Sequence, residues 1–402
     1  MESFPTINFE KDKLNVKNKS RYNIFSWRGQ FTPEFIEYII RNFAKTTETV
    51  FDPFCGSGTV LLESTRHDIA SIGFEINPAA YTMARFISLA ALPVYERKSL
   101  CATLQRRIIS LIGAYHDIPL FETQASFQSS YRNLIHFAYD LLLKIDDKNE
   151  KIIALACLFH AEGKVLDTLG IAIFRSLEIV KTKLINLPFA KKPIFVNLCD
   201  ARISHLYLPK LVDLIITSPP YINVFNYHQN YRAIMEVLGF NLLKVADSEI
   251  GSNRRNRSNR FRTVVQYALD MEIALNSFAR SLRKDGILVI VVGRESRVRS
   301  IPFLNSSILL QLIESMNIYK TLAIPERVFK NRFGMNIIED ILILQVCGVP
   351  PQQGNAKHIA QQHLLTALHN AQGDVANDIK DALIQIDSIQ PSPIFDKNEI
   401  IL

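Results

Sequence analysis

Residues 50–59 read Val-Phe-Asp-Pro-Phe-Cys-Gly-Ser-Gly-Thr, and this stretch decides the fold. A short apolar run ends at Asp52 and Pro53, two glycines follow, and apolar residues then recur at helical spacing. This order predicts a strand, a tight turn and a helix. Because Gly56 and Gly58 lack a Cβ, the turn can bring its backbone close to a ligand. The P-loop ending and the dinucleotide spacing G-x-G-x-x-G are both missing, so a plain tight turn stays open as the alternative.

An acidic residue follows the next predicted strand. Residues 69–74 read as that strand, and Glu75 stands at its carboxyl end. In nucleotide-binding βαβ units an acid at this place, about 20 residues after the glycine turn, accepts hydrogen bonds from ribose hydroxyls. The alternative is a surface acid that precedes a helix starting near Asn77 and Pro78.

A proline-rich motif, Thr217-Ser218-Pro219-Pro220-Tyr221, follows the continuous apolar run of residues 211–216. Such a run is typical of a central strand in a parallel sheet. The motif is therefore expected beyond the carboxyl edge of the sheet, where ligands bind in open α/β folds. Proline has no N–H and a fixed φ, so the Pro219 carbonyl is a free acceptor with a set direction. A rigid strand-to-loop turn is the alternative.

Residues 52–59 and 217–221 together resemble the cofactor and catalytic motifs of the amino-group DNA methyltransferases, which use S-adenosylmethionine. The resemblance extends over roughly residues 20–86 and 195–349. It implies an α/β fold with a doubly wound, mostly parallel, seven-stranded Rossmann-like sheet, interrupted here by a helical insertion.

The resemblance also implies the site residues. Asp200, at the end of a predicted strand, would accept a hydrogen bond from the adenine amine of the cofactor. Residues 31–32 lie in a segment that the resemblance places near the methionine end of the cofactor, although a well-capped core helix explains them equally. The implied cofactor-binding residues are Phe31, Thr32, Asp52, Pro53, Phe54, Gly56, Ser57, Gly58, Thr59, Glu75 and Asp200.

The implied catalytic residues are Ser218, Pro219, Pro220 and Tyr221. The Ser218 hydroxyl and the Pro219 carbonyl would accept the amine hydrogens of the target base, and Tyr221 would stack on a base taken out of the helix. This chemistry positions the reactants and needs no metal. A serine at the first position favours cytosine N4 as the target. Adenine N6, guanine N2 in RNA, and an inactive binding subunit remain as alternatives.

The length of 402 residues allows one large domain with insertions, or two domains. We expect a loose leader and the cofactor-binding half in residues 1–86, and a helical insertion in residues 87–194, with breaks near Pro119 and Gly163. The catalytic half is expected in residues 195–349. A linker and a helical tail would occupy residues 350–402, with helices near 356–371 and 377–386.

The charge of the chain favours a nucleic-acid partner. The net charge is +7, which suits double-stranded DNA. Residues 251–262 contain five arginines and no acid, so a DNA-binding loop is predicted, with a merely solvated loop as the alternative. The predicted DNA contacts are Arg254, Arg255, Arg257 and Arg260.

Cysteine usage and hydropathy suggest the compartment. The five cysteines are widely spread and have neither disulfide-framework nor metal-ligand spacing. Residues 1–18 are polar and mixed in charge, unlike a signal peptide, and no apolar run approaches the length of a membrane span. The sequence therefore predicts a cytoplasmic protein with no membrane partner, with a cognate restriction endonuclease as a possible partner and the oligomeric state left open.

Overall fold

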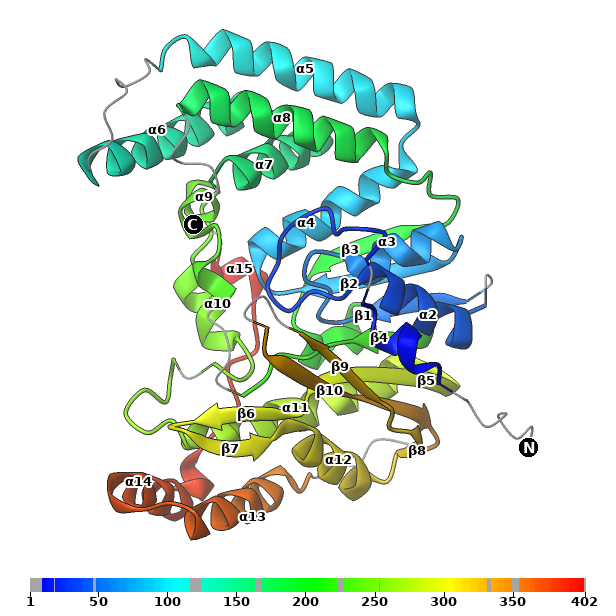
Figure 1. Ribbon diagram of the computed structural model, residues 1–402, viewed down its shortest axis with the longest axis vertical. Helices are drawn as coiled ribbons and strands as arrows, with labels where there is room; N and C mark the ends of the chain where they lie inside the picture. The colour runs from blue at the N-terminus through cyan, green and yellow to red at the C-terminus, as the bar shows by residue number, and fades with distance from the viewer. Residues whose placement is uncertain are drawn as a thin grey trace.

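The computed structural model describes residues 9–17, 19–45, 48–115, 124–162, 168–222, 227–252, 254–330, 334–348 and 354–400. Its centre is one sheet with the strand order β3-β2-β1-β4-β5-β10-β8, with β9 paired to β10 (Figure 1). The strands are β1 (Thr49–Asp52), β2 (Ala70–Glu75), β3 (Ile194–Leu198), β4 (Val212–Thr217), β5 (Leu282–Gly293), β8 (Tyr319–Ala323), β9 (Glu326–Lys330) and β10 (Asn336–Val346).

The predicted doubly wound, mostly parallel sheet is confirmed. Strands β1 to β5 pair in parallel, and β10 runs antiparallel to both β5 and β8. The prediction of seven strands is wrong by one, because β9 also belongs to the sheet. The long strand β10 makes room for it: residues 336–340 pair with β9 and residues 343–346 pair with β8.

Alternating side chains of the strands build two different cores. Leu214 and Ile216 of β4 pack with helix α2 (Pro33–Phe43) on one face of the sheet. Ile215 lies on the other face, with helices α11 (Arg262–Ser281) and α12 (Asn305–Met316). This period of two is that of a strand covered by helices on both sides. Because β1, β2 and β4 pair in parallel, their carboxyl ends meet at one edge of the sheet.

A layer of helices is inserted between β2 and β3, at the top of Figure 1. It packs on helix α4 (Pro78–Ser88), and both belong to one continuous apolar core. The breaks predicted near Pro119 and Gly163 lie outside the described residues. The inserted helices are α5 (Val94–Ile112), α6 (Gln124–Leu143), α7 (Lys148–Glu162) and α8 (Leu169–Ile185).

The expectation of a loose leader is wrong for the part that the structure describes. Helix α1 (Lys11–Leu14) contacts both α2 and β9, and Leu14 is 1% exposed. Its carbonyl accepts from Arg327 Nε at 3.1 Å, and Asn15 Oδ1 accepts from the Val328 N–H at 2.6 Å. One buried leucine and two hydrogen bonds therefore fasten the segment.

The tail forms helices α13 (Ala356–His369) and α14 (Gly373–Ile384), close to the predicted ranges. The linker predicted before them falls largely on residues 349–353, outside the described part. After α14 the chain returns to the body of the molecule and ends in α15 (Lys397–Ile400), beside α10 (Leu242–Ser248) (Figure 1). The remaining elements are η1 (Leu89–Ala91), η2 (Ala201–Leu206), η3 (Tyr227–Gln229), η4 (Ile386–Ser388), α3 (Thr59–Arg66), α9 (Arg232–Val237), β6 (Glu295–Val298) and β7 (Ile301–Leu304). No described helix is long and apolar enough to cross a membrane.

Candidate active site

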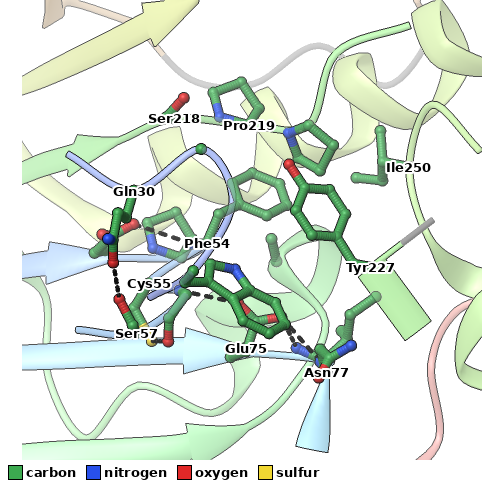
Figure 2. Close-up of a pocket in the computed structure, with 18 of the residues that line it drawn as sticks. Gln30, Phe54, Cys55, Ser57, Glu75, Asn77, Ser218, Pro219, Tyr227 and Ile250 are labelled. Carbon is green, nitrogen blue, oxygen red and sulfur yellow. Dashed lines mark hydrogen bonds between the residues drawn. The ribbon is translucent and has the colours of Figure 1, made fainter. Parts of the chain in front are cut away.

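A cavity opens at the edge where β1, β2 and β4 end (Figure 2). It holds about 1020 Å³ of empty space, including the part that is open to solvent. The four predicted catalytic residues line it, as do nine of the eleven predicted cofactor residues, all except Thr32 and Gly58. The lining residues are Trp27, Arg28, Gly29, Gln30, Phe31, Asp52, Pro53, Phe54, Cys55, Gly56, Ser57, Thr59, Glu75, Ile76, Asn77, Asp200, Ala201, Ser218, Pro219, Pro220, Tyr221, Tyr227, Ser248, Glu249 and Ile250.

The glycine turn needs its glycines for two different reasons. Gly56 has φ +50° and Gly58 has φ +88°, values that favour glycine. A Cβ on Gly58 would lie 3.2 Å from the Cα of Ala84, so this glycine allows α3 and α4 to pack closely. A Cβ on Gly56 would lie 3.1 Å from the ring of Trp27, on the cavity side. Gly58 therefore serves packing, while Gly56 shapes the cavity.

Glu75 holds the turn in place. Its Oε2 accepts from the Gly56 N–H at 3.0 Å, and its Oε1 accepts from the N–H groups of Ile76 and Asn77 at 2.9 Å each. Withdrawal from bulk water nevertheless raises the pKa of Glu75 to about 7. Oε2 keeps acceptor capacity, because it has two lone pairs and uses one, whereas Oε1 already accepts two hydrogen bonds. A ribose contact is compatible with this geometry and stays a prediction.

Asp52 is the second acid of the cavity, and its side chain is only 2% exposed. Its Oδ1 accepts from the Thr217 hydroxyl at 2.7 Å and from the Phe54 N–H at 3.1 Å. Among the described residues, Oδ2 has no hydrogen-bond partner. Burial raises the pKa of Asp52 to about 7, and the charge of Glu75 adds to the shift.

The cavity therefore fits a ligand that carries both positive charge and hydrogen-bonding groups. The free Oδ2 of Asp52 suits a cationic group. Among the described residues, the buried Nδ2 of Asn77 has no hydrogen-bond partner, while its Oδ1 caps helix α4. A buried donor without a partner calls for an explanation, and a ligand in the cavity would supply one. S-Adenosylmethionine, with its sulfonium, amino group and ribose, has the matching chemistry.

The Ser-Pro-Pro-Tyr segment forms the opposite wall. Figure 2 shows Ser218 and Pro219 across the cavity from Glu75 and Asn77. The Ser218 hydroxyl lies 3.4 Å from the Tyr221 hydroxyl, at the long end of the hydrogen-bonding range.

The Tyr221 ring packs on Gly293, where a Cβ would come within 2.7 Å of it. The Tyr221 hydroxyl also lies 3.4 Å from Glu339 Oε1, and Glu339 pairs with Arg327 at 3.0 Å. Arg327 in turn donates to the Thr32 hydroxyl at 3.2 Å. Thr32 is the N-cap residue of α2 as expected, but its side chain makes no capping bond, because it is engaged by Arg327. It therefore reaches the catalytic segment through this chain of contacts and does not line the cavity.

Asp200 lines the cavity, but its carboxylate oxygens face other partners. Both oxygens accept from Arg202, with Oδ2 at 2.6 Å from Nη2, and Oδ2 also accepts from the Phe395 N–H at 2.9 Å. Asp270 completes this buried cluster at 2.7 Å from Arg202 Nη1. The adenine contact of Asp200 stays a prediction, and these partners weigh against it.

Several cavity residues were missed from the sequence. Trp27 and Tyr227 stack with ring centroids 5.9 Å apart and an interplanar angle of 21°. His228 and Glu249 form a buried pair with Nδ1 and Oε2 3.0 Å apart, and Glu249 lines the cavity. Burial is the main cause that raises the pKa of Glu249. No local motif marks these residues, although a lone tryptophan beside the predicted cofactor segment was a usable signal.

The arginine-rich segment starts at the cavity and leads away from it. Arg255, Arg257 and Arg260 are exposed and have no described partner. Arg254 is half-buried and pairs with Asp247 at 2.9 Å. Asp247, near the end of α10, thus competes with DNA for Arg254, and the DNA contact of Arg254 stays a prediction.

Comparison with known proteins also finds similarity to DNA methyltransferases. Residues 5–86 match a family model of the N6/N4 methyltransferase type, described as DNA methylase. The type II methyltransferase M.MjaII of Methanocaldococcus jannaschii is 33% identical over 69 residues, which are 17% of this chain and 13% of that protein. The type II methyltransferase M.BsoBI of Geobacillus stearothermophilus is 24% identical over 282 residues, which are 58% of this chain and 55% of that protein. The chain thus spans about half the length of one curated relative and much less of the other.

Among solved structures, TrmN from Thermus thermophilus has a TM-score of 0.33 at 13% identity, over 80% of this chain and 50% of that one. The rRNA methyltransferase aviRa from Streptomyces viridochromogenes has the same TM-score and identity, over 84% of this chain and 94% of that one.

Proposed function

Because residues 5–86 match the family model of the N6/N4 DNA methylases, we propose that the chain is a DNA methyltransferase that acts on an exocyclic amine. The cofactor of the family is S-adenosylmethionine, and the cavity has the charges and donors that suit it. The observation that carries the proposal is that Asp52 and Glu75 share one cavity with Ser218 and Tyr221. The preferred target is cytosine N4, because serine opens the catalytic motif; adenine N6 is the alternative.

The cofactor-facing side of the cavity binds and orients. When bound, S-adenosylmethionine supplies an electrophilic methyl group on a positively charged sulfur. Asp52 offers its free Oδ2 to positive charge, and Glu75 and Asn77 offer an acceptor and a donor to the ribose and base. The Gly56 turn leaves room on the cavity side, with the ring of Trp27 next to it.

The opposite wall prepares the nucleophile. The lone pair of an aromatic amine is delocalised into its ring, so the amine is a weak nucleophile until acceptors favour its pyramidal form. Pro219 offers a carbonyl that the fixed proline φ angles hold in direction. The Ser218 hydroxyl is a second acceptor, once it exchanges its long contact with Tyr221 for the amine. The chain therefore contributes positioning and electrostatic preorganisation.

The proposed reaction requires that the target base leave the DNA duplex and enter the cavity. The Ser218 to Tyr221 segment lines a cavity at the carboxyl ends of the strands, and a base stacked inside a DNA duplex cannot enter such a cavity. Tyr221 and Phe54 line the cavity and offer aromatic surface to an extruded base. Arg255, Arg257 and Arg260 would hold the phosphates that flank it. Double-stranded DNA is the proposed partner, in a reducing cytoplasm, and a cognate endonuclease belongs to the same proposal.

The test is methyl transfer with labelled cofactor. The protein is incubated with labelled S-adenosylmethionine and either duplex DNA or RNA of mixed sequence. We expect label in DNA, and a large loss of it in Tyr221→Ala with cofactor affinity retained, because Tyr221 lies on the wall away from Glu75. Label confined to RNA would replace the proposal by an RNA methyltransferase. Cofactor binding with no transfer to either would indicate an inactive binding subunit.

A further inference from the structure

The segment Ser248–Gly251, at the end of α10, lies along the cavity without belonging to either motif. Ser248, Glu249 and Ile250 line the cavity. Glu249 is 6% exposed and grips the turn η3 at two points. The His228 N–H donates to Oε1 at 2.7 Å, and Nδ1 of His228 lies 3.0 Å from Oε2, where a protonated Nδ1 donates to the carboxylate.

The hydrogen bonds from His228 to Glu249 also fix the position of Tyr227, an aromatic residue of the cavity. Tyr227 immediately precedes His228 in η3 and stacks on Trp27. Its hydroxyl lies 3.4 Å from where a Cβ on Gly29 would stand, so the side chain spans the cavity from η3 to the segment that precedes α2. Figure 2 shows Tyr227 between Ile250 and Asn77. Fixing the backbone of η3 therefore fixes one wall of the cavity.

Two residues later, the same segment touches the catalytic motif. Gly251 has φ +74°, and a Cβ there would lie 2.3 Å from the carbonyl oxygen of Tyr221. No side chain can be accommodated at that distance without moving backbone, because the obstructing atom is itself backbone. Gly251 therefore lets the chain pass directly behind the peptide that carries Tyr221.

We propose that Glu249 and Gly251 are positioning residues of the active site, which set Tyr227 and Tyr221 on two sides of the ligand cavity. The inference rests on the proposed function for what the two tyrosines do, but not for how they are held. Glu249 acts through hydrogen bonds to His228, and Gly251 acts through close backbone contact. Neither needs to touch the substrate.

The first experiment compares Glu249→Ala with Glu249→Gln. A glutamine can accept from the His228 N–H through its oxygen and donate to a neutral Nδ1 through its amide, so it preserves both contacts without the charge. Alanine removes both. The matched control is Glu236→Ala, because Glu236 lies on α9 in an exposed pair with Arg232 and does not line the cavity.

The readout is Trp27, the single tryptophan of the chain. In the ligand-free protein we expect Glu249→Ala to shift its emission to the red and to increase acrylamide quenching, because Tyr227 leaves the stack. Glu249→Gln should recover most of the parental signal, and Glu236→Ala should match the parent. Parental quenching in Glu249→Ala would overturn the proposal. Equal defects in the glutamine and alanine variants would also overturn it, because charge and not hydrogen bonding would then be the cause.

The second experiment compares Gly251→Ala with Gly373→Ala. Gly373 also has a positive φ, +55°, but a Cβ there meets nothing within 4 Å. Both variants carry backbone strain, and only Gly251→Ala displaces the Tyr221 peptide. We expect Gly251→Ala to lower kcat for methyl transfer while the dissociation constant of the cofactor stays near the parental value. Equal kcat in the two variants would contradict the role of Gly251. If Gly251→Ala does not fold, the Glu249 variants decide alone.

The two proposals fail in distinguishable ways. If the parental protein transfers no methyl group to DNA or RNA, the proposed function fails, while Trp27 emission in the ligand-free variants still tests the positioning by Glu249. If transfer occurs and all Glu249 variants behave as the parent, the positioning role fails and the proposed function stands.

Discussion

At the scale of single residues, Asp52 shows how burial sets up the site. Its pKa is raised from 3.8 to about 7, first by burial, while the bonds from Thr217 and Phe54 act in the opposite direction. The folded protein thus binds this proton more tightly than the unfolded chain does. The contribution of Asp52 to stability is therefore greatest below about pH 4 and is lost as the pH rises through about 7. An ionised Asp52 is costly in the empty protein and useful to a cationic ligand.

The raised pKa of Asp52 gives a prediction for cofactor binding. Affinity for S-adenosylmethionine should rise between pH 6 and 8, by up to about tenfold per pH unit below the pKa if one carboxyl must ionise. Asp52→Asn should weaken binding, flatten its pH dependence and raise the free energy of unfolding of the ligand-free protein at pH 8. Calorimetric titration and urea unfolding across this range measure both effects.

The control for this prediction is Glu63→Gln. The pKa of Glu63 is also raised to about 7, chiefly by burial, but Glu63 pairs with Arg21 and does not line the cavity. The variant should keep the parental pH dependence of binding. A pH-independent affinity in the parental protein would rule out Asp52 as the counter-charge.

Short local motifs explain why part of the site could be predicted. Asp52, Glu75 and the segment 218–221 stand at strand ends within recognisable patterns, and a parallel sheet brings such ends together. Glu249 has no such pattern, because its meaning depends on His228, 21 positions earlier, which approaches it only in the fold. Asp200 fits the pattern in sequence, yet the neighbouring Arg202 engages its oxygens.

At the scale of elements, the C-terminal tail is fastened beneath the site by one arginine. Arg202 is 1% exposed and donates to the carbonyls of Ser392 and Pro393 at 2.7 Å each. Asp270 accepts from the N–H and the hydroxyl of Ser392. The sequence shows helices in the tail but not this return, since the contacts join residues nearly 200 positions apart.

Removal of this arginine should be costly. Arg202→Met leaves two buried carboxylates without their cation, which typically destabilises by about 3–5 kcal/mol. Urea unfolding followed by circular dichroism measures the loss. Arg283→Met is the comparison, because its pair with Asp213 is half exposed, and exposed pairs contribute about 0–1 kcal/mol. Similar losses in both variants would show that the tail is not held by this cluster.

The loop between α10 and α11 is a second element with a testable role. Its ends are fixed, by Gly251 against Tyr221 and by Asn259, whose amide donates to Asp381 of α14 at 2.8 Å. Replacing Arg255, Arg257 and Arg260, which lie within this loop or directly after Asn259, with alanine should weaken DNA binding and reduce the log–log salt slope by up to about 2.7 units. Fluorescence anisotropy titrations over a range of salt concentrations measure the slope.

An equal loss of charge at the opposite edge of the sheet is the control. Arg41, Arg66 and Arg283 lie near the amino ends of the parallel strands, at the end of α2, the end of α3 and the start of β5. Their replacement should leave the salt slope nearly unchanged. If both triple variants change the slope alike, the protein binds DNA through its net charge and the loop has no special part.

At the scale of the whole molecule, the sheet was predictable and its additions were not. The strands of the core are apolar runs that end in distinctive residues, so their order along the chain indicates a doubly wound fold. The docking of α1 depends on partners that are distant in sequence. Strand β9 and the hairpin of β6 and β7 pair with neighbouring strands, but no distinctive residues mark them. The helical layer between β2 and β3 is visible as a pattern, but the pattern alone assigns it no partner.

The proposed chemistry fits this architecture as a whole. One wall of the cavity comes from the glycine turn and β2, and the opposite wall comes from β4 and the segment after it. The segment 248–251 joins them, and the arginine loop continues from it. The proposed cofactor side, the proposed base side and the arginine loop are thus connected along one edge of the sheet.

The most direct measurement is the identity of the methylated nucleoside. Duplex DNA is incubated with the protein and isotopically labelled S-adenosylmethionine, digested to nucleosides and analysed by mass spectrometry. We expect label on an exocyclic amine, as N4-methylcytosine or in second place N6-methyladenine, and its loss in Tyr221→Ala. Label on cytosine C5, or none in DNA under conditions where the cofactor binds, would contradict it.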